Sequence, residues 1–325
     1  MAAPDHRFAG VDPELLPMLD MLPELTLSAN TLARTRAMLP EMLSGGAKPD
    51  PSLGSIEEHD AGGVSVRVHT PAGGDPAHRY PAVLHIHGGG YVMGSAAMGD
   101  AVLLPLAAEL ACVIVSVEYR LAPEHPHPAP VEDCYRALRW IWGEGAERIR
   151  IDPARVAVMG ESAGGGLAAA LALLARDRAA ARGDGRRLVF QSLIYPMLDD
   201  RTVTNPDPNP HVGRLVWTAD SNHFGWTALL GREPGGEGVP PYAAAARAED
   251  LRGLPPAFVS VGGLDLFLEE DLDYARRLMR AGVPTELHVF PGAFHGFDMA
   301  PTARSAMVAR NRARSALRSA LHPRR

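Results

Sequence analysis

The pentapeptide Gly-Glu-Ser-Ala-Gly at 160–164 constrains the fold of this chain more than any other feature. It follows an apolar, strand-like run at 155–159 and precedes an alanine- and leucine-rich stretch with the composition of a helix. A Gly-x-Ser-x-Gly sequence at such a junction is typical of a nucleophile elbow, a strained turn that carries the serine hydroxyl clear of a sheet. The pattern predicts alternating strands and helices, with Ser162 as a nucleophile at the end of one strand.

A second motif, His87 followed by three glycines, comes directly after an apolar run. On its own, a triple glycine is typical of a flexible loop. Upstream of an elbow it favours another interpretation, because backbone N–H groups without Cβ atoms around them can hold an oxyanion. We therefore expect the amides of Gly88, Gly89 and Ala163 to be the oxyanion donors, with His87 and Gly90 supporting the loop.

A serine nucleophile needs a base, and the base needs an acid to orient it. Of 13 histidines, His295 lies in a turn-rich loop after the last predicted strand. Asp265 follows the strand before it, which matches the chain order serine, acid, histidine. A single histidine or aspartate is more often structural, but order and flanking strands favour this pair. Glu269 and Glu270 are the rival acids nearby.

These motifs together resemble one known family. The chain is similar to the hormone-sensitive-lipase branch of the α/β-hydrolases, the bacterial family IV esterases. The matching segments are 87–90, Glu-Tyr-Arg-Leu-Ala-Pro-Glu-His-Pro at 118–126, 160–165, Asp265, and His-Gly-Phe at 295–297. The resemblance covers about residues 55–320. It implies an α/β fold, a mostly parallel central sheet covered by helices on both faces, with a helical cap.

Two positions depart from the family pattern. The family often has aspartate before the nucleophile, where this chain has Glu161. It often has Asp-Pro-Leu at the acid, where this chain has Asp265 followed by leucine and phenylalanine. Glu161 keeps the negative charge, so we expect altered support of the elbow rather than loss of catalysis.

The resemblance also divides the chain. We expect an N-terminal helical cap segment at 1–50, a catalytic core at 51–196 and 244–325, and a second cap insertion at 197–243. The Asp-Pro-Glu start at 12–14 and a run at 29–42 indicate two helices in the first segment. An alternating run at 64–70 predicts an antiparallel edge strand. Short apolar runs predict the inner strands at 82–86, 113–117, 156–159, 188–194, 257–261 and 286–290.

Aromatic residues near these motifs and in the insertion are candidates for the wall of a substrate pocket. They are Tyr91, Tyr195, Trp217, Phe224 and Trp226. A pocket roofed by such rings would accept short-to-medium acyl groups.

Composition agrees with an enzyme acting on a small molecule. A chain of 325 residues with 46% hydrophobic content can bury a large core. The net charge of −6 argues against nucleic-acid binding. We expect neither a membrane-inserted helix nor a signal peptide, because no run of 18 apolar residues occurs and the first residues lack a basic-then-apolar pattern. Cys112 and Cys134, the two cysteines, read as buried reduced thiols, which favours a cytoplasmic location.

Neither a metal nor a cofactor is expected. The Glu-His-Pro-His run at 124–127 fits a rigid loop better than a ligand set, and the chain has no G-x-G-x-x-G or P-loop. The expected partner is a small-molecule ester, and a homodimer is left open.

The resulting hypothesis is a serine carboxylic ester hydrolase that acts through Ser162, His295 and Asp265. Two alternatives stay open. The same triad could hydrolyse amides or formamides, or transfer an acyl group to an alcohol. The fold could also serve as a receptor for small molecules without catalysis, although the retained His295 disfavours this.

Overall fold

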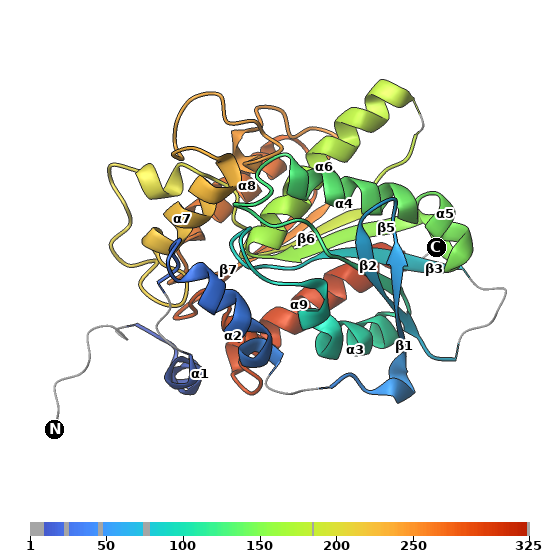
Figure 1. Ribbon diagram of the computed structural model, residues 1–325, viewed down its shortest axis with the longest axis horizontal. Coiled ribbons are helices and arrows are strands. Elements are labelled where there is room, and N and C mark those ends of the chain that lie inside the picture. The colour runs from blue at the N-terminus through green and yellow to red at the C-terminus, as the bar shows by residue number, and fades with distance from the viewer. Residues whose placement is uncertain (1–9, 23–25, 45–47, 74–78, 184, 324–325) are drawn as a thin grey trace.

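A central sheet organises the part of the chain that the computed structural model describes, which is residues 10–22, 26–44, 48–73, 79–183 and 185–323. Within these residues the sheet has eight strands in the order β1-β2-β4-β3-β5-β6-β7-β8 (Figure 1). The strands are β1 (Gly54–Asp60), β2 (Ser65–Pro71), β3 (Tyr80–Ile86), β4 (Val113–Val117), β5 (Ile151–Glu161), β6 (Phe190–Ile194), β7 (Ala257–Gly262) and β8 (Thr285–Phe290).

Pairing in the sheet is parallel from β4 through to β8, and antiparallel where β2 joins β1 and β4. The run at 64–70 is antiparallel as predicted, but its predicted place at the edge is wrong. The edge strand is β1, which pairs with β2 along its whole length. The sequence of β1 conceals it, because Gly-Ser-Ile-Glu-Glu-His-Asp is polar and half exposed. Apolar periodicity detects buried strands better than solvated edge strands.

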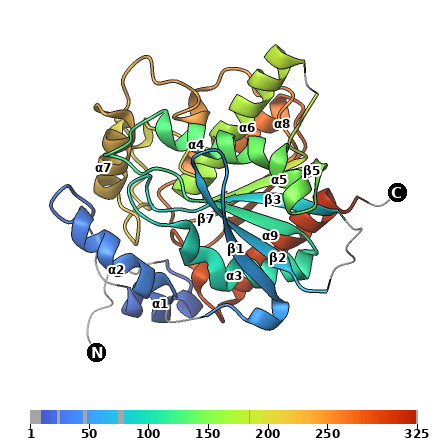
Figure 2. The same cartoon turned by 45° about the vertical axis from the view of Figure 1, so that its right-hand side comes forward.

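Helices cover both faces of the sheet, as Figure 2 shows. On one face α4 (Ala129–Ile141), α6 (Ala163–Arg182) and α8 (Leu268–Arg280) bury their apolar sides against residues such as Leu84, Val115 and Val158. On the other face α3 (Asp100–Leu110) and α9 (Arg304–Leu321) pack on Val83, Ile114 and Ala157. Strands β3, β4, β6 and β7 are therefore buried on both sides. The predicted fold class is confirmed.

The N-terminal segment is helical, with boundaries shifted from the prediction. Asp12 caps a 3-10 turn at Pro13–Leu15 by accepting the amide of Glu14, and α1 (Leu16–Met21) follows. The second helix, α2 (Leu32–Ser44), begins three residues after the predicted start at Ala29. The Ser28 amide donates to the Thr31 hydroxyl in the turn that precedes it.

The segment 197–243, which the sequence predicts to be an insertion, contains α7 (Ala219–Leu230). Two contacts tie the insertion to other segments. The Leu27 amide donates to the Ser221 hydroxyl at 3.2 Å, which joins the N-terminal segment to α7. Arg247 binds both oxygens of the buried Asp200 carboxylate at 2.8 Å, which closes the base of the insertion. The remaining helix, α5 (Glu144–Arg148), is short and precedes β5.

Both cysteines are free and buried, as the sequence predicts. Burial raises the pKa of the Cys112 thiol to about 12, so this thiol is not ionised near neutral pH. Cys134 lies in α4, whereas Cys112 directly precedes β4. In the described residues no helix combines the length and the apolar character that crossing a bilayer requires. The predicted absence of a signal peptide concerns residues 1–9, which lie outside the described residues.

Candidate active site

Ser162 occupies the turn between the end of β5 and the start of α6. Its backbone has φ 56° and ψ −122°, a conformation that non-glycine residues rarely adopt. Hydrogen bonds hold the turn from two sides. The Ser162 amide donates to the Ile194 carbonyl at 2.9 Å, and the Ser162 carbonyl accepts from the amides of Gly166 and Met197. A strained conformation persists only where neighbours over-determine it, and these bonds do so here.

The glycines on either side of Ser162 are required by close packing. A Cβ at Gly160 would overlap the Gly164 carbonyl, and a Cβ at Gly164 would overlap the Ile86 carbonyl of β3. The start of α6 therefore lies directly against β5 and β3, the strands that precede the two predicted motifs. This close packing explains why the sequence has Gly-x-Ser-x-Gly at this junction.

The structure brings the predicted nucleophile, base and acid together in one line of hydrogen bonds. His295 Nε2 lies 2.9 Å from Ser162 Oγ, and His295 Nδ1 lies 2.9 Å from Asp265 Oδ2. A carboxylate can only accept, so Nδ1 carries the hydrogen and Nε2 is left to accept from the serine hydroxyl. Asp265 has no exposed surface, and Ser162 and His295 are each 7% exposed. The second oxygen of Asp265 accepts the Phe267 amide at 3.0 Å.

The rival acids are placed elsewhere. Glu270 is buried and accepts the Leu198 amide at 2.6 Å and the hydroxyl of Thr202, so it anchors the chain after β6. Burial raises the pKa of Glu270 well above its usual range. Glu269 accepts from the side-chain amide of Asn209 at the surface. Only Asp265, among these three carboxylates, is hydrogen bonded to His295 in the structure.

The glycine loop after β3 lies beside Ser162. A Cβ at Gly88 would lie 3.0 Å from the Glu161 carbonyl oxygen and 3.4 Å from Ser162 Cβ. The Gly89 carbonyl accepts the amides of Val92 and Met93, which closes the loop into a turn. Ala163, the third predicted donor, is the first residue of α6 and is fully buried.

His87 shapes this loop from within. Its Nδ1 donates to the Gly88 carbonyl at 2.8 Å, and its ring stacks on Tyr119 with centroids 4.2 Å apart. The Tyr119 hydroxyl returns a hydrogen bond to the His87 carbonyl at 2.9 Å. Burial lowers the pKa of His87 to about 4, so the ring is neutral near pH 7. Tyr119 belongs to the Glu-Tyr-Arg-Leu-Ala-Pro segment, which is thereby tied to the glycine loop.

Aromatic rings surround the His295 imidazole. Tyr195 lies at 4.8 Å and Phe267 at 5.1 Å between ring centroids, both edge-on, and Trp217 lies at 6.2 Å. The Trp217 ring also covers Gly90, where a Cβ would overlap it. Tyr195 and Trp217, two of the predicted pocket residues, thus lie beside the His295 imidazole. Phe267 has no exposed surface, so it supports the imidazole from within the core.

The other predicted pocket residues have different environments. Tyr91 and Trp226 have no exposed surface and pack on each other at 5.3 Å. The Tyr91 hydroxyl donates to the Met197 carbonyl at 2.8 Å. These two side chains therefore lie inside the packed junction between α7 and the core, where they cannot touch a substrate in this conformation. Phe224 is half-buried against the same core.

One buried residue of the site carries no sequence motif. His85, in β3, places Nε2 at 3.0 Å from Glu161 Oε2 and Nδ1 at 2.8 Å from Ser116 Oγ. A histidine within the apolar run at 82–86 was its only signal in the sequence, and that signal does not identify a partner.

The described residues contain no cluster of three or more His, Cys, Asp or Glu side chains suited to a metal ion. In the Glu-His-Pro-His run, Glu124 forms an ion pair with Arg36 of α2 at 2.7 Å. Arg36 lowers the pKa of Glu124 to about 2.

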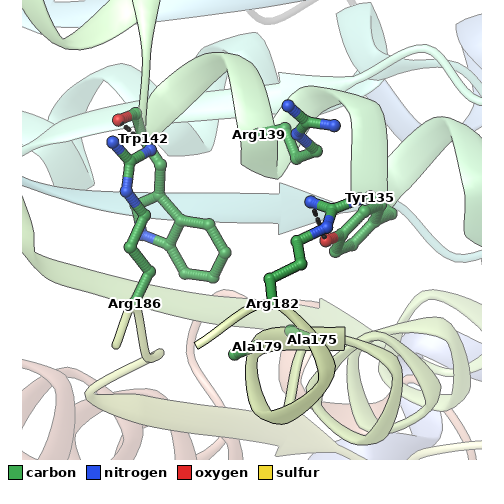
Figure 3. A pocket seen from close by; sticks show the side chains of 7 residues that line it. All are labelled: Tyr135, Arg139, Trp142, Ala175, Ala179, Arg182 and Arg186. Atoms are coloured by element: carbon green, nitrogen blue, oxygen red, sulfur yellow. Dashed lines mark hydrogen bonds between the residues drawn. The ribbon is translucent and has the colours of Figure 1, made fainter. Parts of the chain in front are cut away.

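A separate groove of about 520 Å³ lies between the C-terminal parts of α4 and α6 (Figure 3). Arg182 donates to the Tyr135 hydroxyl at 3.0 Å, and Arg186 donates to the Trp142 carbonyl. Guanidinium groups at these helix ends complement the negative end of the helix dipole. The groove begins near Ala175, about 20 Å along α6 from Ser162 at 1.5 Å per residue. These hydrogen bonds and helix-end positions give Arg182 and Arg186 a structural role.

Comparisons with known proteins agree with this geometry. A family model described as "alpha/beta hydrolase fold" matches residues 83–299. The chain is 35% identical to carboxylesterase NlhH of Mycobacterium tuberculosis, over 99% of this chain and 100% of NlhH. It is 34% identical to esterase LipI of the same organism, over 96% of each chain. Its structure resembles that of a bacterial heroin esterase with a TM-score of 0.89 and 38% identity, covering 97% of this chain and 99% of the other.

The family model includes both the glycine loop and the histidine loop, and both full-length relatives are esterases by name. The chain thus belongs to the α/β-hydrolase family, in its hormone-sensitive-lipase-like branch of carboxylic ester hydrolases.

Proposed function

We propose that this enzyme hydrolyses carboxylic esters through an acyl-enzyme formed on Ser162. The observation that carries the proposal is the position of His295, whose two ring nitrogens are each 2.9 Å from a partner, Ser162 on one side and Asp265 on the other. This is the arrangement in which a histidine can remove the serine proton while a buried carboxylate holds its tautomer.

The reaction has two stages. In the first, Ser162 Oγ attacks the ester carbonyl carbon while His295 Nε2 accepts the serine proton. The tetrahedral intermediate then collapses, and His295 returns that proton to the departing alcohol. In the second, His295 removes a proton from water, the hydroxide attacks the acyl-enzyme, and the proton returns to Ser162 as the carboxylic acid leaves. Asp265 stabilises the imidazolium in both stages.

The amides of Gly88, Gly89 and Ala163 are the proposed oxyanion donors. Support comes from the close approach of Gly88 to Ser162 and from the position of Ala163 at the first turn of α6. A helix N-terminus presents unpaired N–H groups and the positive end of its dipole. Each donor is expected to contribute about 3 kcal/mol of transition-state stabilisation.

Short-to-medium acyl groups are the proposed substrate class. The positions of Tyr195 and Trp217 beside His295 support a closed pocket, because bulky rings leave limited room beside the nucleophile. We further propose that the segments 1–50 and 197–243 form the cap over this pocket. The hydrogen bond from Leu27 to Ser221 supports a joint role for the two segments.

Covalent labelling tests the proposal. An organophosphonate ester should phosphonylate Ser162 alone, and Ser162→Ala should lose nearly all turnover of p-nitrophenyl butyrate. Intact-mass and peptide analysis would locate the label. A label on another serine, or substantial turnover by Ser162→Ala, would refute the assignment.

A further inference from the structure

His85 and Glu161 form a partly buried hydrogen-bonded link next to the nucleophile. His85 Nε2 donates to Glu161 Oε2 at 3.0 Å, and the Ser116 hydroxyl donates to His85 Nδ1 at 2.8 Å. The three side chains come from adjacent strands, β4, β3 and β5. His85 is 5% exposed and Glu161 is 31% exposed. The Ser116 bond fixes the plane of the ring, so His85 presents Nε2–H to Glu161 in one orientation.

The bond joins the two turns that must cooperate in catalysis. Glu161 directly precedes Ser162, and His85 lies three residues before Gly88. Backbone pairing between β3 and β5 ends at Ile86 and Gly160, so the sheet ladder does not extend to the glycine loop and the elbow. The side-chain bond between His85 and Glu161 joins the same two strands at the end of this ladder.

The spacing between these turns is narrow. The position of a Cβ on Gly88 would be 3.0 Å from the Glu161 carbonyl oxygen. A small rotation of Glu161 would therefore move Ser162 relative to the Gly88 amide. Misplacement of catalytic groups by about 1 Å can reduce a rate by about 100-fold.

We propose that His85 is a positioning residue, which holds Glu161 and thereby sets the distance between the nucleophile and the oxyanion donors. This role rests on the proposed function, because it assumes that Ser162 and the glycine loop act on the same carbonyl group. His85 does not touch the substrate. Its effect is confined to the geometry of the transition state, so it should alter kcat and leave KM nearly unchanged.

A double-mutant cycle on the full chain tests this role. His85→Phe keeps a buried ring and removes both hydrogen bonds, and Glu161→Ala removes the acceptor. Each should lower kcat for p-nitrophenyl butyrate by about 10-fold to 100-fold, with KM within about twofold of wild type. The double variant should lose no more than either single variant, because both remove the same bond. Glu161→Gln keeps an acceptor oxygen and should retain most of the wild-type kcat.

The chain offers a matched control in β2. His69 is fully buried, and its Nε2 lies 2.9 Å from the Asp100 carboxylate. This hydrogen bond has nearly the same length as the bond between His85 and Glu161, but it does not involve the elbow. His69→Phe should lower the Tm without lowering kcat, when rates are measured well below the unfolding temperature. Equal kcat losses in His69→Phe and His85→Phe would overturn the positioning role, and so would losses that multiply in the double variant. If His85→Phe keeps the wild-type kcat while Ser162→Ala is inactive, the positioning role is refuted and the proposed function stands. If Ser162→Ala is itself active, the proposed function is refuted.

Discussion

At the scale of single residues, chain order identified side chains that the fold brings together. Ser162, Asp265 and His295 were selected by the turns and strands around them, and the structure places them in hydrogen-bond contact. Order was informative because parallel strands end at the same edge of a sheet, so loops that follow them meet there. His85 could not be selected in this way, since its partner Glu161 is defined by a diagonal contact between strands.

The proposed acid, Asp265, gives the sharpest residue-scale prediction. Asp265→Asn should lower kcat by about 1,000-fold or more, because an amide cannot hold the imidazole tautomer that leaves Nε2 free to accept. Circular dichroism should show an intact fold. Glu269→Gln is the control, since its carboxylate contacts Asn209 at the surface. A larger loss in Glu269→Gln than in Asp265→Asn would mean that the acid is misassigned.

At the scale of elements, buried strands were predictable and polar elements were not. The apolar run at 82–86 predicts β3, which is fully buried. The polar sequence of β1 does not predict a strand. The aromatic residues of α7 show the same limit. Trp226 was predicted to line the pocket, but it packs on Tyr91 with no exposed surface. Composition identifies a ring that needs burial without specifying whether protein or substrate will cover it.

The attachment of α2 to the core depends on Arg36. Its guanidinium donates to the carbonyls of Val92 at 2.7 Å and Ala122 at 2.9 Å, and it pairs with Glu124. The Val92 amide in turn donates to the Gly89 carbonyl, so Arg36 links α2 to the glycine loop. The Glu124 pair is half exposed and contributes little by itself, whereas the partly buried carbonyl contacts contribute more.

Arg36→Ala should therefore loosen α2 and reduce kcat/KM. Loss of the charged hydrogen bonds should weaken this attachment by about 1–3 kcal/mol. Hydrogen exchange measured by mass spectrometry should show faster exchange in the peptide 26–40. Arg34→Ala is the matched control, because Arg34 lies exposed on the same helix. Equal exchange rates in the two variants would contradict an anchoring role for Arg36.

The proposed closed pocket predicts a limit on acyl length. Each added methylene should raise kcat/KM by about fourfold while it is buried, equivalent to about 0.8 kcal/mol, until the pocket is full. Across p-nitrophenyl esters from acetate to palmitate, we expect a maximum between about two and eight carbons.

Two tryptophan variants test whether the rings set this limit. Trp217→Ala should move the maximum to longer chains, because the Trp217 ring lies beside His295. Trp226→Phe should leave it unchanged, because Trp226 is enclosed by protein. A maximum at twelve or more carbons in the wild type would exclude a closed pocket.

At the scale of the whole molecule, stability depends on pH through carboxyl groups buried in the first turn of α8, Glu270 and Asp271. Asp271 is fully buried, and among the described residues neither of its oxygens has a hydrogen-bond partner. Burial, followed by the charges of Glu270 and Asp265, raises the pKa of Asp271 well above its usual range. The folded protein therefore keeps a proton on Asp271 at pH values where the unfolded chain has lost it. Between the two pKa values the folded state binds more protons, so this group lowers stability as pH rises.

Asp271→Asn should remove this pH dependence. The amide imitates the protonated acid in shape and charge, so the variant should match the wild type near pH 4, where the carboxyl is protonated in the folded state. At pH 8 the variant should be more stable by roughly 1–3 kcal/mol, because no buried carboxyl remains to be ionised or held protonated. Denaturant unfolding at several pH values measures the difference, with Glu249→Gln, an exposed position, as the control. If the free energies of unfolding of Asp271→Asn and the wild type differ by the same amount from pH 4 to pH 8, or differ more at pH 4, Asp271 is not the group that links folding to pH. Turnover should follow the wild type throughout, because Asp271 lies outside the hydrogen bonds that join Asp265, His295 and Ser162.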